Sequence, residues 1–275
     1  MIMWIDLLFE PLQYSFISRA LLVCILVGIT CPFLGAFVIN REMAFMGDAL
    51  AHAVLPGLVV AYAFGISPFI GALPTGIIVA LTIGYIVKKS GVSNDTSIGI
   101  VFSVLFSLGL IILSLTGGTK LNVEDILLGQ LLGTSITDVY ITIGTTVVLS
   151  VVLIIFYRQL VFVGFDFQGA KVAGLPADKL DYLLLILITV VIVMSLQVVG
   201  IILVVGMLIT PAAASSLIVR RFPPVILLGI VFGVLSAVSG LYLSYYFNLP
   251  SGPSIAMVSS IIFAICFAAS RCLKA

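Results

Sequence analysis

Nine long apolar stretches, almost free of charged residues, limit this chain to a membrane environment. About 20 apolar residues in a helix cross a bilayer core about 30 Å thick. Charged residues make up 8% of the 275 positions and hydrophobic residues 62%, so a water-soluble surface cannot be built. This composition excludes soluble enzymes and nucleic-acid-binding proteins. We expect an all-α membrane protein, a polytopic helical bundle forming one domain over 1–275, with spans near 18–40, 43–65, 67–87, 97–116, 137–157, 182–197, 199–219, 224–247 and 253–270.

The count of nine depends on the stretch 182–219, which only Gln197 and Gly200 interrupt. Merging it into one span would give eight helices and place Arg220 opposite Arg41. Nine spans, with the N-terminus outside, satisfy the positive-inside rule. They put ten of the twelve basic residues on the cytoplasmic side: Arg41, Lys88, Lys89, Arg158, Lys171, Lys179, Arg220, Arg221, Arg271 and Lys274.

Three longer segments lie outside the expected spans. Residues 1–17 mix charged and aromatic residues with apolar ones, which suits a helix in the membrane interface. The outer connection 117–136 has the pattern of a short amphipathic helix, and 158–181 is the larger, cytoplasmic connection. The chain has no Walker A motif, so it is expected to be no enzyme and not to hydrolyse ATP itself.

One ionisable residue, Asp48, lies well inside an apolar span, and His52, the single histidine, follows four residues later. Residues four apart share a helix face. Counted from Arg41 at the membrane edge, Asp48 lies about 10 Å and His52 about 16 Å into the bilayer. A carboxylate at this depth costs at least about 2.5–3.5 kcal/mol and needs a partner or water. A carboxylate and an imidazole on adjacent turns form half of a divalent-cation site.

The residues alone leave other roles open for this pair. Asp48 could accept a hydrogen bond from a neighbouring helix beside a structural His52, or the two could relay protons. An intramembrane metalloenzyme is disfavoured, because it needs three protein ligands. Metal permeation is favoured by Pro56, which cannot donate a hydrogen bond to the carbonyl of residue 52, since interrupted helices are typical of transporter substrate sites.

The seventh span repeats this pattern, because Pro211 leaves the carbonyl of Met207 without its helical donor. We therefore expect an interrupted helix there as well. Met43 and Met46 are soft residues near the site, and packing is favoured for them over a role as thioether ligands. The candidate pathway-lining residues are Met46, Pro56, Met207 and Pro211.

The stretch GDALAHAVLPG (47–57) closely resembles the signature of the permease subunit of metal-type ABC importers, which take up manganese, zinc or iron. Nearly the whole chain shares the resemblance, through LGAFVINREMAFMGDA (34–49), DTSIGIVFSVLFSLGLIILS (95–114), LLGQLLG (127–133) and VVGIILVVGMLITPAAAS (198–215). The resemblance implies a fold like that of type II ABC importers. It also implies that Asp48 and His52 form the metal site in the translocation path.

The same resemblance implies partners and a location. The permease would form a homodimer in a prokaryotic inner membrane, with its pathway on the dimer axis. Two cytoplasmic ATPase subunits would hydrolyse ATP, and an external metal-binding lipoprotein would deliver the metal. No cofactor would be permanently bound. A proton-coupled secondary metal transporter is the alternative, but the chain lacks the inverted repeat expected of one.

The segment GFDFQGAKVAGLP (164–176) resembles the coupling helix of ABC permeases, with small residues at Ala170 and Gly174. Small residues on one face of a short helix suit insertion into a groove of another protein, and an ordinary amphipathic loop helix is the alternative. Apolar contacts would come from the larger side chains. The expected ATPase-contacting residues are Phe165, Asp166, Phe167, Ala170, Val172, Gly174 and Leu175.

The ligand types favour manganese. Asp48 offers a hard oxygen and His52 a borderline nitrogen, and carboxylate, carbonyl and water ligands suit manganese better than soft thiolate sites do. Two copies of the chain would supply two carboxylates and two imidazoles, enough for six-coordination with carbonyls or water. Zinc binds the same ligands more tightly in the Irving–Williams order, so zinc and iron remain alternatives.

Overall fold

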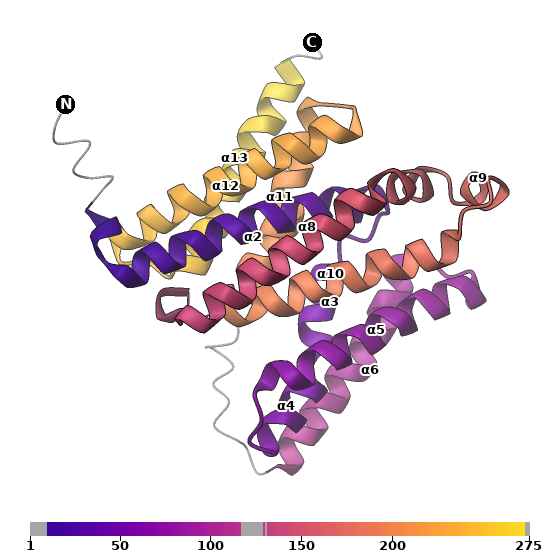
Figure 1. Ribbon diagram of the computed structural model, residues 1–275, viewed down its shortest axis with the longest axis horizontal. Coiled ribbons are helices and arrows are strands. Elements are labelled where there is room, and N and C mark those ends of the chain that lie inside the picture. Colours follow the sequence, from indigo (N-terminus) through magenta and orange to yellow (C-terminus); the bar gives the residue numbers. More distant parts are fainter. Residues whose placement is uncertain (1–9, 117–128, 130, 273–275) are drawn as a thin grey trace. The chain divides into compact units, whose positions relative to one another are not determined.

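The computed structural model describes residues 10–116, 129 and 131–272, which form helices joined by short connections (Figure 1). Within this part of the chain, nine helical segments are long and apolar enough to cross a membrane. The expectation of an all-α membrane protein with nine spans is therefore confirmed. The elements are η1 (Pro11–Gln13), α2 (Ser15–Asn40), α3 (Met46–Ala53), α4 (Leu55–Ala63), α5 (Pro68–Ser90), α6 (Asn94–Leu115), η2 (Leu131–Gly133), α8 (Ile136–Phe165), α9 (Phe167–Val172), α10 (Ala177–Val199), α11 (Ile201–Ile218), α12 (Phe222–Phe247) and α13 (Ser251–Cys272).

The chain divides into two compact units, and α2, α8 and α10 contribute residues to both. The α3–α6 unit comprises 37–122 and 149–194. The α11–α13 unit comprises 1–36, 123–148 and 195–275. The expectation of a single domain over 1–275 stays a prediction.

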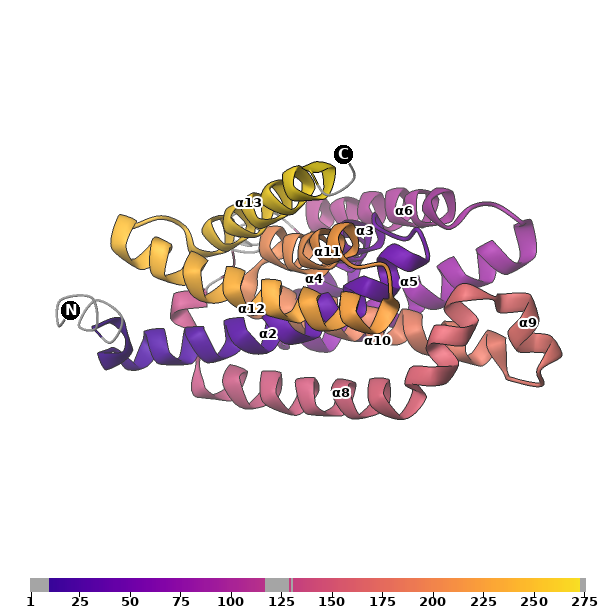
Figure 2. The ribbon, with the colours of Figure 1, turned by 90° about the horizontal axis from the view of Figure 1, so that it is seen from above.

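Close helix crossings hold the α11–α13 unit together, and Figure 2 shows α12 and α13 running beside α11. Gly28 of α2 faces the backbone of Gly233 in α12, and a Cβ there would lie 3.1 Å from it. Gly35 lies against the carbonyl of Leu208 in α11. Small residues let helix backbones approach closely, which is how helices associate in a membrane without a hydrophobic driving force.

In the α3–α6 unit, glycines also allow close packing where α4 crosses α5. A Cβ at Gly57 would collide with the Gly71 carbonyl and the Thr75 hydroxyl, and a Cβ at Gly71 would collide with the Gly57 carbonyl. Figure 1 shows α4, α5 and α6 packed side by side. The buried residues Val54, Leu58, Ala72 and Val193 form a core beside this crossing.

A single glycine separates the sixth and seventh spans. Gly200 adopts a φ of 81° and a ψ of 163°, and α11 begins at the next residue. A non-glycine residue rarely takes this conformation, so the position ends α10 sharply. This backbone break is the reason that 182–219 forms two helices.

Several boundaries differ from the expected ones. The helices α8 and α10 extend beyond the apolar stretches, so the connection expected at 158–181 shrinks to residues 166–176. The apolar pattern ends at the membrane surface, whereas the hydrogen-bonded helices continue past it. Residues 1–9 of the expected interfacial segment, and most of the outer helix expected within 117–136, lie outside the described residues.

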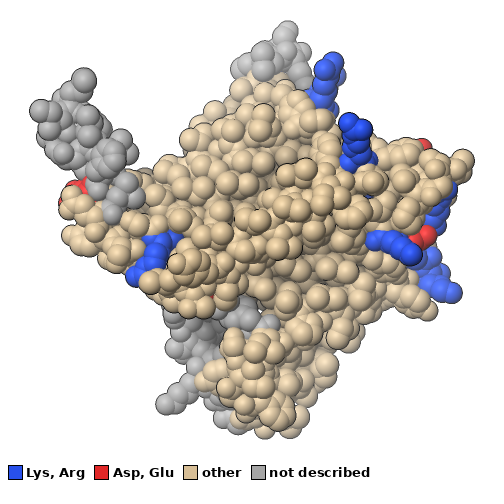
Figure 3. Space-filling model, in the orientation of Figure 1, with Lys and Arg blue, Asp and Glu red and all other residues tan. Residues whose placement is uncertain are grey.

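Charged side chains are sparse on the visible face of the molecule. Figure 3 shows long uncharged areas over the helices, with a few Lys and Arg side chains towards their ends. This distribution fits helices surrounded by lipid tails, where charge is costly.

Candidate metal-transport site

The second membrane span is interrupted in the middle, as expected. Helix α3 ends at Ala53, α4 begins at Leu55, and Pro56 occupies the first turn of α4. The N–H of Val54 donates to the Leu50 carbonyl at 3.2 Å and is also directed at the His52 carbonyl. The carbonyl of His52 has no i+4 donor, because proline at position 56 has no N–H.

Asp48 and His52 lie one turn apart on α3, on one face. The His52 Nε2 atom is 3.6 Å from Asp48 Oδ1, and the two side chains are 27% and 41% exposed, respectively. This distance is longer than that of a good hydrogen bond. It leaves room for one cation bound by both side chains at metal–ligand distances of about 2.0–2.2 Å.

One chain supplies an incomplete ligand set. In the part of the chain that the structure describes, no group of three or more His, Cys, Asp or Glu side chains could hold a metal. Divalent transition metals take four to six ligands. Water, backbone carbonyls or a second copy of the chain must complete any site built on Asp48 and His52.

The ring of His52 packs against two phenylalanines of α6. Its centroid lies 5.5 Å from that of Phe106 and 6.1 Å from that of Phe102. Phe45, at the start of α3, meets Phe102 edge-on at 6.0 Å. Sequence reasoning missed these residues, although the spacing of Phe102 and Phe106 by four positions places both on one face of α6.

The four candidate pathway-lining residues are buried and belong to different units. Met46 and Pro56 lie in the α3–α6 unit, whereas Met207 and Pro211 lie in the α11–α13 unit. The interruption expected at Pro211 is wrong, because α11 runs unbroken from Ile201 to Ile218. One missing hydrogen bond bends or weakens a helix without necessarily ending it. The lining role of these four residues stays a prediction.

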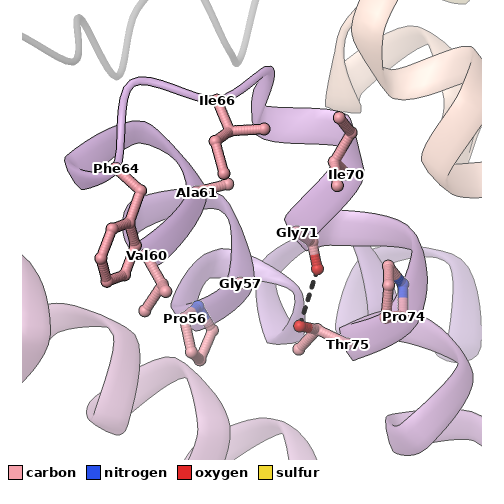
Figure 4. A pocket seen from close by; sticks show the side chains of 10 residues that line it. All are labelled: Pro56, Gly57, Val60, Ala61, Phe64, Ile66, Ile70, Gly71, Pro74 and Thr75. Carbon is pink, nitrogen blue, oxygen red and sulfur yellow. Dashed lines mark hydrogen bonds between the residues drawn. The ribbon is translucent and has the colours of Figure 1, made fainter.

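An apolar pocket of about 430 Å³ lies between α4 and α5 (Figure 4). Pro56 and Gly57 line one side, and Gly71, Pro74 and Thr75 line the other. The Thr75 hydroxyl donates to the Gly71 carbonyl at 2.8 Å, which leaves few polar groups free to face the cavity. Asp48 and His52 do not line it. Among the residues that the structure describes, no Asp, Glu, His or Cys side chain lines this pocket.

The segment expected to couple to an ATPase contains a short capped helix, α9. The Asp166 carboxylate accepts a 2.8 Å hydrogen bond from the Gly169 N–H, an N-cap arrangement. At the other end, the N–H of Leu175 donates to the Ala170 carbonyl, and that of Gly174 donates to the Lys171 carbonyl. These two bonds form a Schellman motif, which explains the φ of 80° at Gly174.

The side chains of α9 are not arranged as expected. Ala170 is fully buried against its own chain, so its small size serves packing within the unit rather than an open docking face. Gly174 adopts the positive φ that the backbone turn at the end of α9 requires. Among the expected ATPase-contacting residues, the most exposed apolar side chains are those of Val172 and Phe165, which are 90% and 61% exposed. Sequence periodicity could not separate these faces, because α9 has fewer than two turns.

Ion pairs connect α9 to the neighbouring helix ends. The Asp178 carboxylate accepts bonds from Lys171 at 3.1 Å and Lys88 at 3.0 Å. Asp181, one turn further along α10, pairs with Arg41 in the turn that precedes α3. Three of the basic residues expected on one membrane side therefore meet the first two turns of α10.

An ionisable pair beside an interrupted membrane helix is typical of transport proteins. Residues 13–270 match the model of the ABC 3 transport family, and the chain belongs to this family. The chain is 45% identical over 258 residues to the manganese transport system membrane protein MntC of Halalkalibacterium halodurans, covering 94% of this chain and 88% of that protein.

Two further relatives extend the comparison. The chelated iron transport system membrane protein YfeD of Yersinia pestis is 36% identical over 263 residues, which are 96% of this chain and 88% of that protein. A solved structure of PsaBC from Streptococcus pneumoniae in complex with a Fab is similar over 96% of this chain and 95% of that chain. Its TM-score is 0.83 and its sequence identity 38%.

Proposed function

We propose that this chain is the transmembrane permease subunit of an ABC importer that takes up manganese. The observation that carries the proposal is the Asp48–His52 pair at the break between α3 and α4, with ligand atoms 3.6 Å apart. An oxygen and a nitrogen at this separation can bind one divalent cation, and the interrupted helix supplies a backbone carbonyl nearby.

Manganese is proposed ahead of other metals for two reasons. Hard oxygen ligands from carboxylate, carbonyl and water suit it. The similar MntC protein of Halalkalibacterium halodurans is named for manganese transport. Iron is the second candidate, because the similar YfeD protein is named for chelated iron transport.

The proposed importer contains two copies of this chain in a prokaryotic inner membrane. Two ATPase subunits on the cytoplasmic side supply the energy, and an external lipoprotein delivers the metal. Two copies supply two carboxylates and two imidazoles, which supports a site completed across the dimer axis. The exposed side chains of Val172 and Phe165 on and beside α9 support docking of the ATPase there.

Competition for uptake tests the proposed metal. Cells that depend on this chain for metal uptake are given radioactive manganese with a tenfold excess of unlabelled manganese, zinc or iron. We expect unlabelled manganese to suppress the labelled uptake most strongly. Suppression by zinc or iron, with little effect of manganese, would reject manganese as the cargo.

A further inference from the structure

The imidazole of His52 is held against an aromatic wall formed by Phe102 and Phe106 on α6. These two rings are nearly parallel, with an interplanar angle of 18° and centroids 5.6 Å apart. The His52 ring stands at 71° to Phe106 and at 58° to Phe102. The imidazole therefore meets both rings at steep angles, and edge-to-face contacts of this kind are favourable and directional.

The wall has a fixed position relative to the helix break. Gly109, three residues after Phe106, lies against the residues that begin α4: a Cβ there would lie 3.0 Å from the Leu55 side chain and from the Pro56 nitrogen. This close approach fixes α6 beside the break. Phe106 precedes Gly109 by about one turn of α6. It therefore lies about one turn from the break between α3 and α4, which follows His52.

We propose that Phe102 and Phe106 are positioning residues of the cation site. They hold the imidazole of His52 in the orientation that directs Nε2 towards Asp48. This inference rests on the proposed function, because it assumes that Nε2 binds the transported metal. The two phenyl rings present no hydrogen-bonding group that could compete with the metal for that nitrogen.

Phe102 and Phe106 can affect metal affinity because the imidazole ring of a histidine is otherwise free to rotate. Rotation about χ2 of histidine is broad, with two wide minima rather than three narrow ones. An unrestrained imidazole in a half-exposed site must lose this freedom when it binds a metal. Restraining one side chain in advance raises affinity by about threefold to tenfold. Removal of the wall should weaken metal binding by that factor without removing a ligand.

The test measures Mn²⁺ binding to the full-length chain purified in lipid nanodiscs. Phe106→Leu keeps an apolar side chain but removes the ring, and we expect its dissociation constant for Mn²⁺ to rise about threefold to tenfold. Phe106→Tyr keeps the ring and should restore affinity to within about twofold. Phe64→Leu, which removes a ring beyond the end of α4, is the matched control and should leave affinity unchanged.

A spectroscopic measurement separates positioning from general stability. Electron spin-echo modulation of bound Mn²⁺ reports a coordinated imidazole nitrogen, and we expect this nitrogen signal to weaken in Phe106→Leu and to return in Phe106→Tyr. If His52→Ala keeps the wild-type nitrogen signal, the proposed metal site fails. If His52→Ala loses the signal but Phe106→Leu keeps both signal and affinity, the positioning role alone is wrong.

Discussion

Pro56 removes one backbone hydrogen-bond donor at the depth of the proposed metal site. Pro56→Ala would supply an N–H to the carbonyl of His52 and allow α3 and α4 to join. Proline is tolerated in the first turn of a helix, so this variant should change thermal stability little while its metal uptake falls. Pro74→Ala, in the interior of α5, is the control and should gain stability with uptake unchanged. Unchanged uptake in Pro56→Ala would show that the freed carbonyl has no role in transport.

At the residue scale, Asp48 and His52 could be found from the sequence because each is exceptional there. One is a carboxylate within an apolar span, and the other is the single histidine. Phe102 and Phe106 could not be found in this way, because phenylalanine is ordinary in a membrane helix. Their significance comes from the packing of α6 against the break, which Gly109 permits.

At the element scale, α9 depends on the left-handed conformation of Gly174. Replacing Gly174 costs about 1 kcal/mol for alanine, less for asparagine and more for a β-branched residue. We expect metal-stimulated ATP hydrolysis by the assembled transporter to decrease in the order wild type, Gly174→Asn, Gly174→Ala, Gly174→Val. A loss that is equal for all three variants would contradict a backbone role for this glycine.

The exposed and buried residues of α9 allow docking to be distinguished from packing. Val172→Asp places a charge on a side chain that is 90% exposed, so the chain should fold normally but lose metal-stimulated ATP hydrolysis if α9 contacts the ATPase. Ala170→Trp should instead lower the thermal stability of the chain, because Ala170 is fully buried and overpacking costs about 1–3 kcal/mol. Full stimulation of hydrolysis in Val172→Asp would contradict docking at α9.

The sequence predicted the existence of this short helix but not the direction of its side chains. The resemblance to a coupling helix identifies the segment in the sequence. Which of its side chains are buried depends on the helices that pack against it. The ion pairs of Lys88 and Lys171 with Asp178 fix α9 against α5 and α10. The Lys88–Asp178 pair joins residues 90 positions apart, and sequence spacing gives no indication of it.

At the scale of the whole molecule, the positive-inside rule predicts the orientation in the membrane. Residue 168 should face the cytoplasm and residue 67 the outside, and both side chains are exposed. In a variant without the four native cysteines, Gln168→Cys should react with a membrane-impermeant maleimide only after the membrane is opened. Ser67→Cys should react in intact cells. Reaction of both from the same side would refute the nine-span topology.

The number of spans could be predicted because apolar length and charge placement both follow from the bilayer. The unbroken course of α11 through Pro211 could not, since a helix tolerates a proline where neighbouring helices support it. The division into two compact units also has no marker in the sequence, because its boundaries fall within α2, α8 and α10.

The central claim is that manganese crosses the membrane through a site formed by Asp48 and His52. Its most direct test is ATP-dependent uptake of radioactive manganese by liposomes that contain this chain with its ATPase and binding protein. Asp48→Asn and His52→Ala should each reduce uptake at least about tenfold, because an interaction with a charged group is worth about 1.5–3 kcal/mol. Asp138→Asn, in the first turn of α8, should transport normally. Uptake at the wild-type rate by either Asp48→Asn or His52→Ala would contradict the claim.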